Sequence, residues 1–332
     1  MKRLGKIDRS SLEKIVLRRL GYRRRDVIIP PRFGEDASVV RSRRRILVAA
    51  MDPITGSGTR VGWLSVHVNA NDVAVMGAEP KWFSVTILLP EGGLEELEPI
   101  MGEIDRACKE LKIALITGHT EIAPGVEKPI IVGHMIGELV SKKPISSSGA
   151  RPGDLLVMSK TAGIEGTAIL ASDFRQELSG KVSEGVLRRA ERFYERISVL
   201  EEALRLARRN LPTAMHDPTE GGIIGGAYEL AEASGCSFTI YEDEVPVAEE
   251  TRRICEALGC DPLKLISSGV LLAAIPRRKL GQAMRAVRDL RVIGEFGGKR
   301  EGSRVIRSDG SEEKVREAVL DELWRLLMER GE

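Results

Sequence analysis

The sequence predicts a two-domain α+β protein, and three observations support that fold class. The chain has 332 residues, which is enough for two ordinary domains with a core in each. Apolar segments of strand type and helix type are mixed in both halves, without the strict alternation of a doubly wound parallel sheet. Residues 146–153 are small and turn-forming, and a fresh apolar strand follows them. We therefore expect one domain at 1–148 and a second at 149–332.

The first half is expected to contain two helices and several short strands. Apolar residues at helical spacing predict an amphipathic helix at 98–112, where Pro99 suits the first turn. A shorter helix is expected at 11–20, and residues 26–33 are expected to be extended. Short apolar runs predict strands at 37–40, 46–51, 83–89, 113–117 and 130–139.

The second half is expected to mix strands and helices in the same way. Apolar runs predict strands at 154–159, 237–241 and 269–275. Helical periodicity predicts a long helical region at 182–210, a helix after Thr219 and a C-terminal helix at 312–330.

Composition limits the class of protein. Hydrophobic residues make up 42% and charged residues 30% of the chain, which fits a globular protein and excludes general disorder. No apolar run approaches the ~20 residues of a membrane span, and no apolar stretch of a signal peptide follows the N-terminus. We therefore expect a cytoplasmic protein without a membrane partner. An abundance of Arg and Glu with only two glutamines is typical of a thermophile.

The N-terminal segment is strongly basic. Residues 1–45 hold 15 Lys and Arg against 5 Asp and Glu, which leaves 36 basic and 44 acidic residues for the remainder. Such an arm can meet nucleic acid or another polyanion, but only Tyr22 and Phe33 are available there for base stacking. A solvated arm that complements the acidic body or a partner subunit is the simpler interpretation, so we do not expect nucleic acid as a partner.

Four acidic or amide motifs of the first half are expected in turns at strand ends. No P-loop and no dinucleotide-binding glycine motif occurs. The motifs are G-E-D-A at 34–37, M-D-P at 51–53, V-N-A-N-D-V at 68–73 and G-H-T-E at 118–121. Each alone is explained by a turn or a helix cap. Together they predict a Mg²⁺ site, because carboxylates and substrate phosphates are the usual ligands of this ion.

Two motifs of the second half extend this hypothesis. T-A-G-I-E-G-T at 161–167 follows a strand and opens a helix. Such a turn either offers free N–H groups to a phosphate or is a plain connection. M-H-D-P-T-E-G-G at 215–222 contains Asp217 and Thr219, either of which is able to cap the helix that follows.

Taken in order, these motifs resemble the superfamily of aminoimidazole ribonucleotide synthetase and the hydrogenase-maturation protein HypE. Thiamine-monophosphate kinase and selenophosphate synthetase are members of it as well. G-E-D-A at 34–37 is similar to the family's G-D-D-A, and residues 69–80 are similar to its V-N-D-x-A-x-M-G-A-x-P. D-P-T-E-G-G at 217–222 is similar to its D-P-T-R-G-G. The resemblance covers about residues 34–275.

The resemblance implies a fold, a ligand and an assembly. An N-terminal α/β domain would dimerise into a shared barrel, and a C-terminal α+β domain would fold over it. ATP and Mg²⁺ would lie in a cleft beside the interface of the homodimer. The positions that match the family's motifs imply the following roles: Asp36, Asp52 and Asp72 as metal or phosphate ligands, Asn69 in their support, Gly34, Gly163, Gly166 and Thr167 near the nucleotide, and Asp217 from the second domain.

Three departures from the family pattern shape the functional hypotheses. His119 replaces the carboxylate of the family's G-D-T, and Glu121 follows it, so both are candidate catalytic residues. Ser268 stands where HypE has an acidic residue, and no cysteine follows Cys260, so the reaction of HypE on its own C-terminal Cys is not expected. The histidines His67, His134 and His216 are expected to be structural.

We therefore predict an ATP-dependent synthetase or phosphotransferase that phosphorylates an oxygen of a small-molecule substrate. The alternative is a catalytically reduced, HypE-like accessory protein that binds a partner protein in cofactor or hydrogenase maturation.

Overall fold

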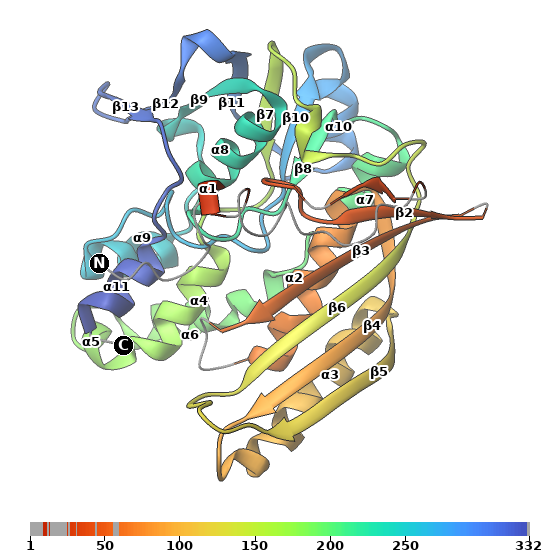
Figure 1. The fold of residues 1–332 in the computed structure, drawn as a ribbon. Coiled ribbons are helices and arrows are strands. Elements are labelled where there is room, and N and C mark those ends of the chain that lie inside the picture. The colour runs from red at the N-terminus through yellow and green to blue at the C-terminus, as the bar shows by residue number, and fades with distance from the viewer. Residues whose placement is uncertain are drawn as a thin grey trace.

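The computed structural model describes residues 9–11, 13, 25, 27–30, 32–43, 45–55 and 60–330. These residues form two halves, each built on one sheet, with a helical layer between and beside them (Figure 1). The short helix α1 (Arg9–Ser11) lies in the N-terminal arm. The helix predicted at 11–20 lies almost entirely outside the described residues, as does much of the basic arm.

The first half contains a six-stranded sheet with the strand order β1-β2-β3-β6-β4-β5. Neighbouring strands are antiparallel except β4 and β5, which are parallel. The strands have these bounds: β1 Val27–Ile29, β2 Ser38–Ser42, β3 Arg45–Ile54, β4 Ala78–Leu89, β5 Ala114–Ile122 and β6 Ile130–Leu139. Three helices accompany them: α2 Val61–Val75, the 3-10 turn η2 Gly93–Glu96 and α3 Leu97–Leu111.

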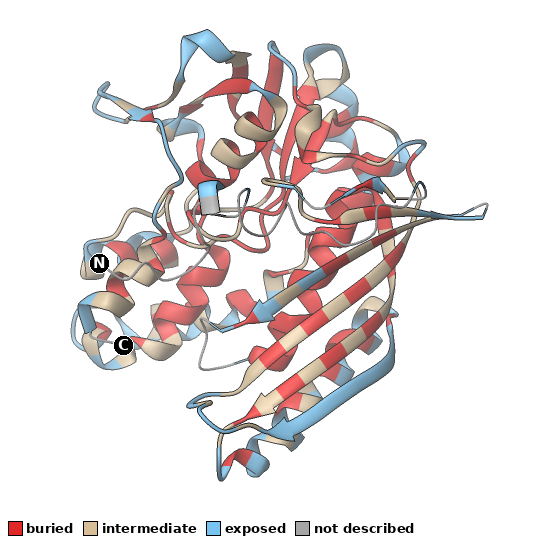
Figure 2. Ribbon diagram, in the orientation of Figure 1, coloured by how far each residue is buried: buried red, intermediate tan, exposed pale blue. Residues whose placement is uncertain are grey.

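In the part of the chain that the structure describes, only one face of this sheet is covered (Figure 2). Residues of β4 and β6 alternate between buried and half-buried positions, and the buried set of β6 faces α2. At Gly133 the approach is close, because a Cβ atom there would lie 2.4 Å from the Asn69 Nδ2 atom. All nine residues of the edge strand β5 are exposed. The other face and this edge are therefore not covered by any residue that the structure describes.

The second half contains a seven-stranded sheet with the order β13-β12-β9-β11-β7-β10-β8, antiparallel except for β9 and β12. The strands are β7 Asp154–Met158, β8 Ala214–His216, β9 Cys236–Tyr241, β10 Leu272–Pro276, β11 Arg291–Gly298, β12 Ser303–Ile306 and β13 Glu312–Val315. The α-helices are α4 Ile164–Asp173, α5 Arg175–Leu178, α6 Glu184–Glu191, α7 Leu200–Arg208, α8 Gly222–Ser234, α9 Glu249–Leu258, α10 Leu280–Ala286 and α11 Glu322–Arg330. Short 3-10 turns complete it: η3 Ser147–Gly149, η4 Arg192–Arg196, η5 Glu242–Glu244, η6 Arg277–Lys279 and η7 Lys299–Glu301. The predicted mixture of sheets and helices without βαβ alternation is confirmed.

Helix α2 belongs to the first half but is buried on every side, from Val61 to Val75. On the side away from its sheet it holds the backbone of the second half. The Trp63 Nε1–H donates to the Tyr194 carbonyl at 2.8 Å, and Asn71 bonds both the Ile197 carbonyl and the Val199 N–H at 2.9 Å. The two halves are thus joined along this helix.

The helical region expected at 182–210 is present as two helices, α6 and α7, which the irregular turn η4 separates. The prediction for the C-terminal segment was wrong. The helix expected at 312–330 is the strand β13 followed later by α11, because residues 312–315 pair with β12 and leave only the last part of the segment helical. Among the described helices, none is both long and apolar enough to cross a membrane.

Candidate functional site

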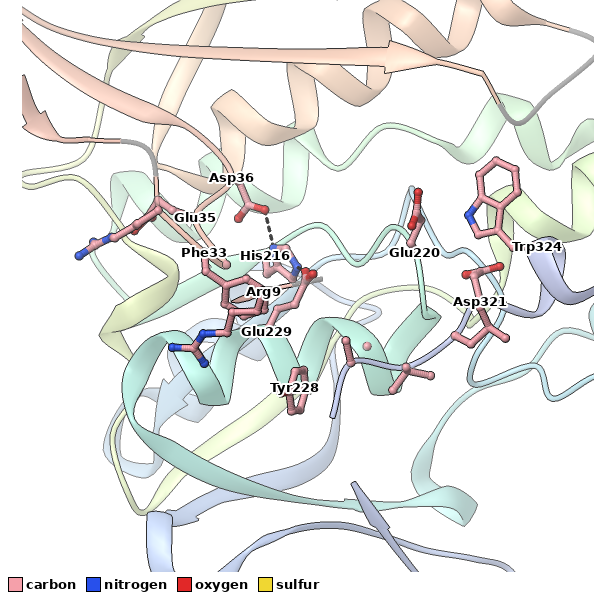
Figure 3. A pocket seen from close by; sticks show the side chains of 16 residues that line it. Arg9, Phe33, Glu35, Asp36, His216, Glu220, Tyr228, Glu229, Asp321 and Trp324 are labelled. Carbon is pink, nitrogen blue, oxygen red and sulfur yellow. Dashed lines mark hydrogen bonds and ion pairs between the residues drawn. The ribbon is translucent and has the colours of Figure 1, made fainter. Parts of the chain in front are cut away.

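A cavity of about 330 Å³ lies where the N-terminal segment, α8 and the segment before α11 meet (Figure 3). Its wall is rich in acidic and aromatic side chains. The acidic side chains are Glu35, Asp36, Glu220, Glu229 and Asp321, and the aromatic ones are Phe33, Tyr228 and Trp324. A pocket of this size suits a small ligand.

His216, at the end of β8, forms two ion pairs in the wall of this pocket. Its Nδ1 lies 2.6 Å from Asp36 Oδ1, and its Nε2 lies 2.8 Å from Glu229 Oε2 (Figure 3). Burial lowers the pKa of the imidazole, but the two carboxylates outweigh burial and raise the pKa to about 10. His216 is therefore a cation at neutral pH, which fits its predicted structural role and also fixes the carboxylate of Asp36.

The G-E-D-A motif builds one wall of the pocket. Gly34 has a φ of +73°, and a Cβ there would lie 3.1 Å from the Glu229 carbonyl oxygen, so a larger residue would be strained and crowded. The Glu35 carboxylate accepts from the Ser147 N–H at 3.1 Å and pairs with Arg32 at 2.6 Å. Glu35 thus fixes the G-E-D-A segment against the backbone of Ser147, while Asp36 faces the pocket.

Asp36, Asp52, Asp72 and Asp217 come from four segments of the chain and lie near one another. Burial raises the pKa of Asp72 well above its ordinary value, and the charges of Asp52, Asp36 and Asp217 raise it further. Burial also raises the pKa of Asp217 to about 7, although a hydrogen bond from Asn71 opposes the rise. The predicted convergence of these four residues is therefore present in the fold.

The secondary structure around two of these residues was predicted wrongly. Asp52 lies inside β3, which continues to Ile54, and Asp72 lies in the last turn of α2 rather than in a turn between strands. The V-N-A-N-D-V run has apolar residues two apart and so reads like a strand, but every face of α2 is buried and no polar face marks it as a helix.

Two asparagines of α2 position the aspartates. The Asn69 amide accepts from the Asp52 N–H at 2.9 Å and donates to the Asp52 and Ser65 carbonyls at 3.2 and 2.9 Å. Asn69 therefore holds the strand that carries Asp52, and all of its polar atoms are used within the chain. Asn71, which we did not single out from the sequence, donates to Asp217 Oδ2 at 2.9 Å.

Asp217 does not cap the helix that follows it. Helix α8 begins after Gly221, whose φ is +79° and whose N–H donates to Asp321 at 2.6 Å. The Asp217 carboxylate instead accepts from Asn71 and, at 3.4 Å, from the Gly269 N–H. Neither Asp217 nor Thr219 caps α8, so both capping hypotheses were wrong and Asp217 is available to the site.

The sequence left open whether the turn before α4 offers free N–H groups or is a plain connection, and its two glycines do not offer free N–H groups. The Gly163 N–H donates to Ser267 Oγ at 2.8 Å, and the Gly166 N–H donates to the Ile266 carbonyl at 2.9 Å. The Thr167 hydroxyl bonds the Thr251 hydroxyl at 2.8 Å and is fully buried. These groups hold α4 in place, and a nucleotide role for them stays a prediction.

Glu165, in the first turn of α4, is a buried carboxylate that sequence reasoning missed. Its Oε2 atom has no hydrogen-bond partner among the described residues. Burial raises its pKa to about 7, the facing Ser268 opposes the rise, and Asp217, Asp52 and Glu220 add to it. The only signal in the sequence was an acidic residue inside the glycine-bearing motif at 161–167.

His119 and Glu121 do not join this group within one chain. Both lie on the exposed edge strand β5, where they point the same way and contact each other, His119 Nε2 to Glu121 Oε2, at 3.1 Å. Their catalytic role stays a prediction. His67, expected on a strand-like stretch, lies instead on α2, and burial lowers its pKa to about 3, so it is a neutral core residue.

The donor chemistry of the acidic group fits Mg²⁺, which prefers carboxylate oxygen. Within the described residues, however, no three Asp, Glu, His or Cys side chains are already gathered closely enough to hold an ion by themselves. Mg²⁺ in proteins usually binds one or two carboxylates together with waters and substrate phosphates, so it does not require three gathered side chains. Asp52 and Asp72 are the residues that would hold it.

Comparison with known families decides the relationship. Residues 34–139 match the N-terminal domain of AIR synthase related protein, and residues 151–307 match its C-terminal domain. The chain belongs to the AIR synthase-related family. The resemblance inferred from the motifs is therefore confirmed.

Relatives of this AIR synthase-related protein carry names from hydrogenase maturation. A protein of Methanocaldococcus jannaschii named for hydrogenase expression and formation is 31% identical over 295 residues, 86% of this chain and 84% of that protein. Carbamoyl dehydratase HypE of Escherichia coli is 29% identical over 256 residues, 74% of this chain and 73% of that protein.

A solved structure of HypE in complex with ATP has a TM-score of 0.72 at 23% identity and covers 96% of both chains. This match confirms the fold of both halves. A single chain does not show the shared barrel of the expected dimer.

Proposed function

We propose that this AIR synthase-related protein binds ATP with Mg²⁺ at the acidic group and transfers the γ-phosphoryl group to an oxygen of a small substrate. The observation that carries the proposal is the convergence of Asp36, Asp52, Asp72 and Asp217 from four segments. Asp72 and Asp217 are buried, and the negative charges around them destabilise the protein unless a ligand supplies positive charge. The solved HypE–ATP complex of the same fold adds support.

We assign the residues of the site different roles in this phosphoryl transfer. The substrate oxygen forms a bond to the γ-phosphorus while the bond from phosphorus to the β–γ bridging oxygen breaks, which releases ADP. The Asp217 carboxyl, whose pKa lies at about 7, takes the proton of the substrate. His216 holds the Asp36 carboxylate in place through their ion pair. Bound Mg²⁺ supplies the neutralisation of phosphate charge.

Titration of ATP by calorimetry, with and without Mg²⁺, tests this site together with a long assay of ADP release. We expect Mg²⁺-dependent binding that Asp72→Asn weakens about a hundredfold, because one ionic oxygen ligand is lost. Asp154→Asn is the matched control, since Asp154 is equally buried but lies on β7 and bonds Thr213 at 2.7 Å. Equal ATP affinity in Asp72→Asn and wild type would reject the site assignment.

We also infer that the protein forms a homodimer through β5 and the open face of the first sheet. Leu115, Ile116 and Ile122 on β5 and Met51 on β3 are exposed by 41–64%. An exposed apolar edge strand is a ready template for pairing with another chain. Pairing there would bring His119 and Glu121 to the interface.

Sedimentation velocity tests the dimer directly. Ile116→Glu places a charge on the edge strand and is expected to convert a dimer into a monomer without loss of stability, since the side chain is exposed in the monomer. Leu94→Glu, at an equally exposed position off the strand, is expected to remain dimeric. A wild-type monomer at high concentration would contradict the inference.

A second function, that of an accessory protein in hydrogenase maturation, is favoured by the names of the relatives. It predicts ATP binding without repeated turnover and a stable protein partner. Purification of the full chain from native lysate, combined with the ADP-release assay, separates the two functions. Multiple turnovers in the absence of any partner would contradict the accessory role.

A further inference from the structure

A second cavity, of about 490 Å³, lies at the other end of α2 from Asp72. Its wall combines positive charge with two aromatic rings. The residues are Arg60, Trp63, Arg106, Arg188, Glu191, Arg192, Tyr194 and Glu195, and we call this group the arginine cavity. They come from the start of α2, from α3, from α6 and from η4, so the cavity spans both halves.

Ion pairs neutralise only part of the charge in the arginine cavity. Arg60 lies 3.5 Å from Glu103, and Arg192 lies 3.3 Å from Glu195. Glu191 is already bound to an arginine outside the cavity, Arg175. Among the described residues, no carboxylate within ion-pair distance is found for Arg106 or Arg188. Within the described ranges, these two guanidinium groups on the wall therefore have no counter-ion.

Arg106 is held ready for a ligand by its contact with Trp63. Its guanidinium lies 4.7 Å from the centre of the indole ring. That ring is itself fixed, because the Trp63 Nε1–H donates to the Tyr194 carbonyl. A guanidinium stacked on a ring still points its N–H groups outward from its edge, where they can donate hydrogen bonds. Because stacking already restricts the side chain, the side chain loses little conformational entropy when a ligand binds.

We propose that the arginine cavity binds a small molecule through a phosphate or carboxylate group, at a site separate from the acidic group. A guanidinium offers two parallel N–H donors to either oxyanion, and the volume admits a small molecule of ordinary metabolite size. The walls exclude a cation, since the two unpaired charges are positive. The proposal does not depend on ATP binding at the acidic group.

Calorimetric titration with inorganic phosphate, and separately with malonate, in chloride buffer tests the cavity. We expect saturable binding of at least one probe. Arg106→Gln and Arg188→Gln are each expected to weaken it at least tenfold. Arg278→Gln, at an arginine of η6 far from the cavity in the fold, is the control and is expected to leave it unchanged. Preference for phosphate or for malonate would identify which oxyanion the site takes.

Three results would overturn the proposal: no saturable binding of either probe, equal affinity in the two cavity variants and wild type, or loss of phosphate binding in Asp72→Asn. The last result would place the anion at the acidic group instead. Retained phosphate binding in Asp72→Asn, together with lost ATP binding, is the pattern expected of two separate sites. Failure of ATP to bind wild-type protein would reject the proposed function but leave the cavity untouched.

Discussion

The two ends of α2 carry opposite charge, and they are built in different ways. Asp72 lies in the last turn of the helix among other buried carboxylates, whereas the arginine cavity borders the first turn. The helix dipole would favour the reverse, with negative charge at the start and positive charge at the end. Helix electrostatics therefore explains neither cluster, which points to ligands as the reason for both.

Burial distinguishes the two ends. Asp72, Asp217 and Glu165 are shielded from water, so each needs a specific partner to be tolerated. The arginines of the cavity are largely exposed and are solvated without a ligand. We therefore expect substitutions at the acidic end to change stability and its pH dependence strongly, and substitutions at the basic end to change ligand affinity with little effect on stability.

The largest stability effect is expected for His216→Gln. Removal of the cation takes its counter-charge from the Asp36 carboxylate, whose side chain is only 8% exposed, and this costs about 3 kcal/mol of unfolding free energy. Because the folded-state pKa of about 10 lies above the ordinary 6.5, the stabilisation is complete below about pH 6.5 and is lost as pH rises toward 10. Urea unfolding at pH 6 and pH 10 measures both effects.

His134→Gln is the control for that experiment, since His134 is half-buried on β6 and has no carboxylate partner among the described residues. Equal destabilisation by the two variants would show that the ion pairs of His216 add nothing to the free energy of unfolding beyond what a half-buried histidine contributes.

A smaller effect is expected for Glu165→Gln. The pKa of Glu165 is raised from 4.5 to about 7, so the folded state holds its proton more tightly and the ligand-free protein loses stability as pH rises from about 4.5 to 7. Glutamine removes that penalty, and the variant should be more stable than wild type at pH 8 by about 2 kcal/mol. Thermal unfolding at pH 4.5 and pH 8 checks this, with the exposed Glu110→Gln expected to follow wild type.

The smallest stability effect is expected for Arg106→Gln, at the basic end. The stacking on Trp63 contributes less than about 1 kcal/mol at an open site, so urea unfolding should differ little from wild type. If Arg106→Gln lowered the free energy of unfolding as much as His216→Gln, the proposed difference between the two ends of α2 would be contradicted.

The sequence was sufficient for the fold class. Asp36, Asp52, Asp72 and Asp217 were assigned to the site because their positions match the motifs of the family, and their roles there stay a prediction. Their secondary structure was not found, because a helix buried on all sides lacks the periodic polar face that marks surface helices.

Other parts of the site depend on contacts between distant segments. The sequence around Glu165 is that of an ordinary helix start with an acidic residue. Only the packing of α4 against α6, α9 and η4 shows that Glu165 is buried. Arg106 and Arg188 each read as part of a solvated helix face, because nothing local shows that α3 and α6 face the same cavity. Pairing across the fold decides such cases, and a single sequence contains no local signal for it.

The bonds from Trp63 and Asn71 to the backbone of residues 194–199 have a mechanical consequence. They span two turns of α2 and attach the helix to the second half, while its other side packs on the first sheet. The halves are thus unable to swing apart about this helix as hinged lobes do. We expect one cooperative melting transition for the whole chain, and ligand access through the rim formed by Phe33 and Trp324 rather than through opening of the halves.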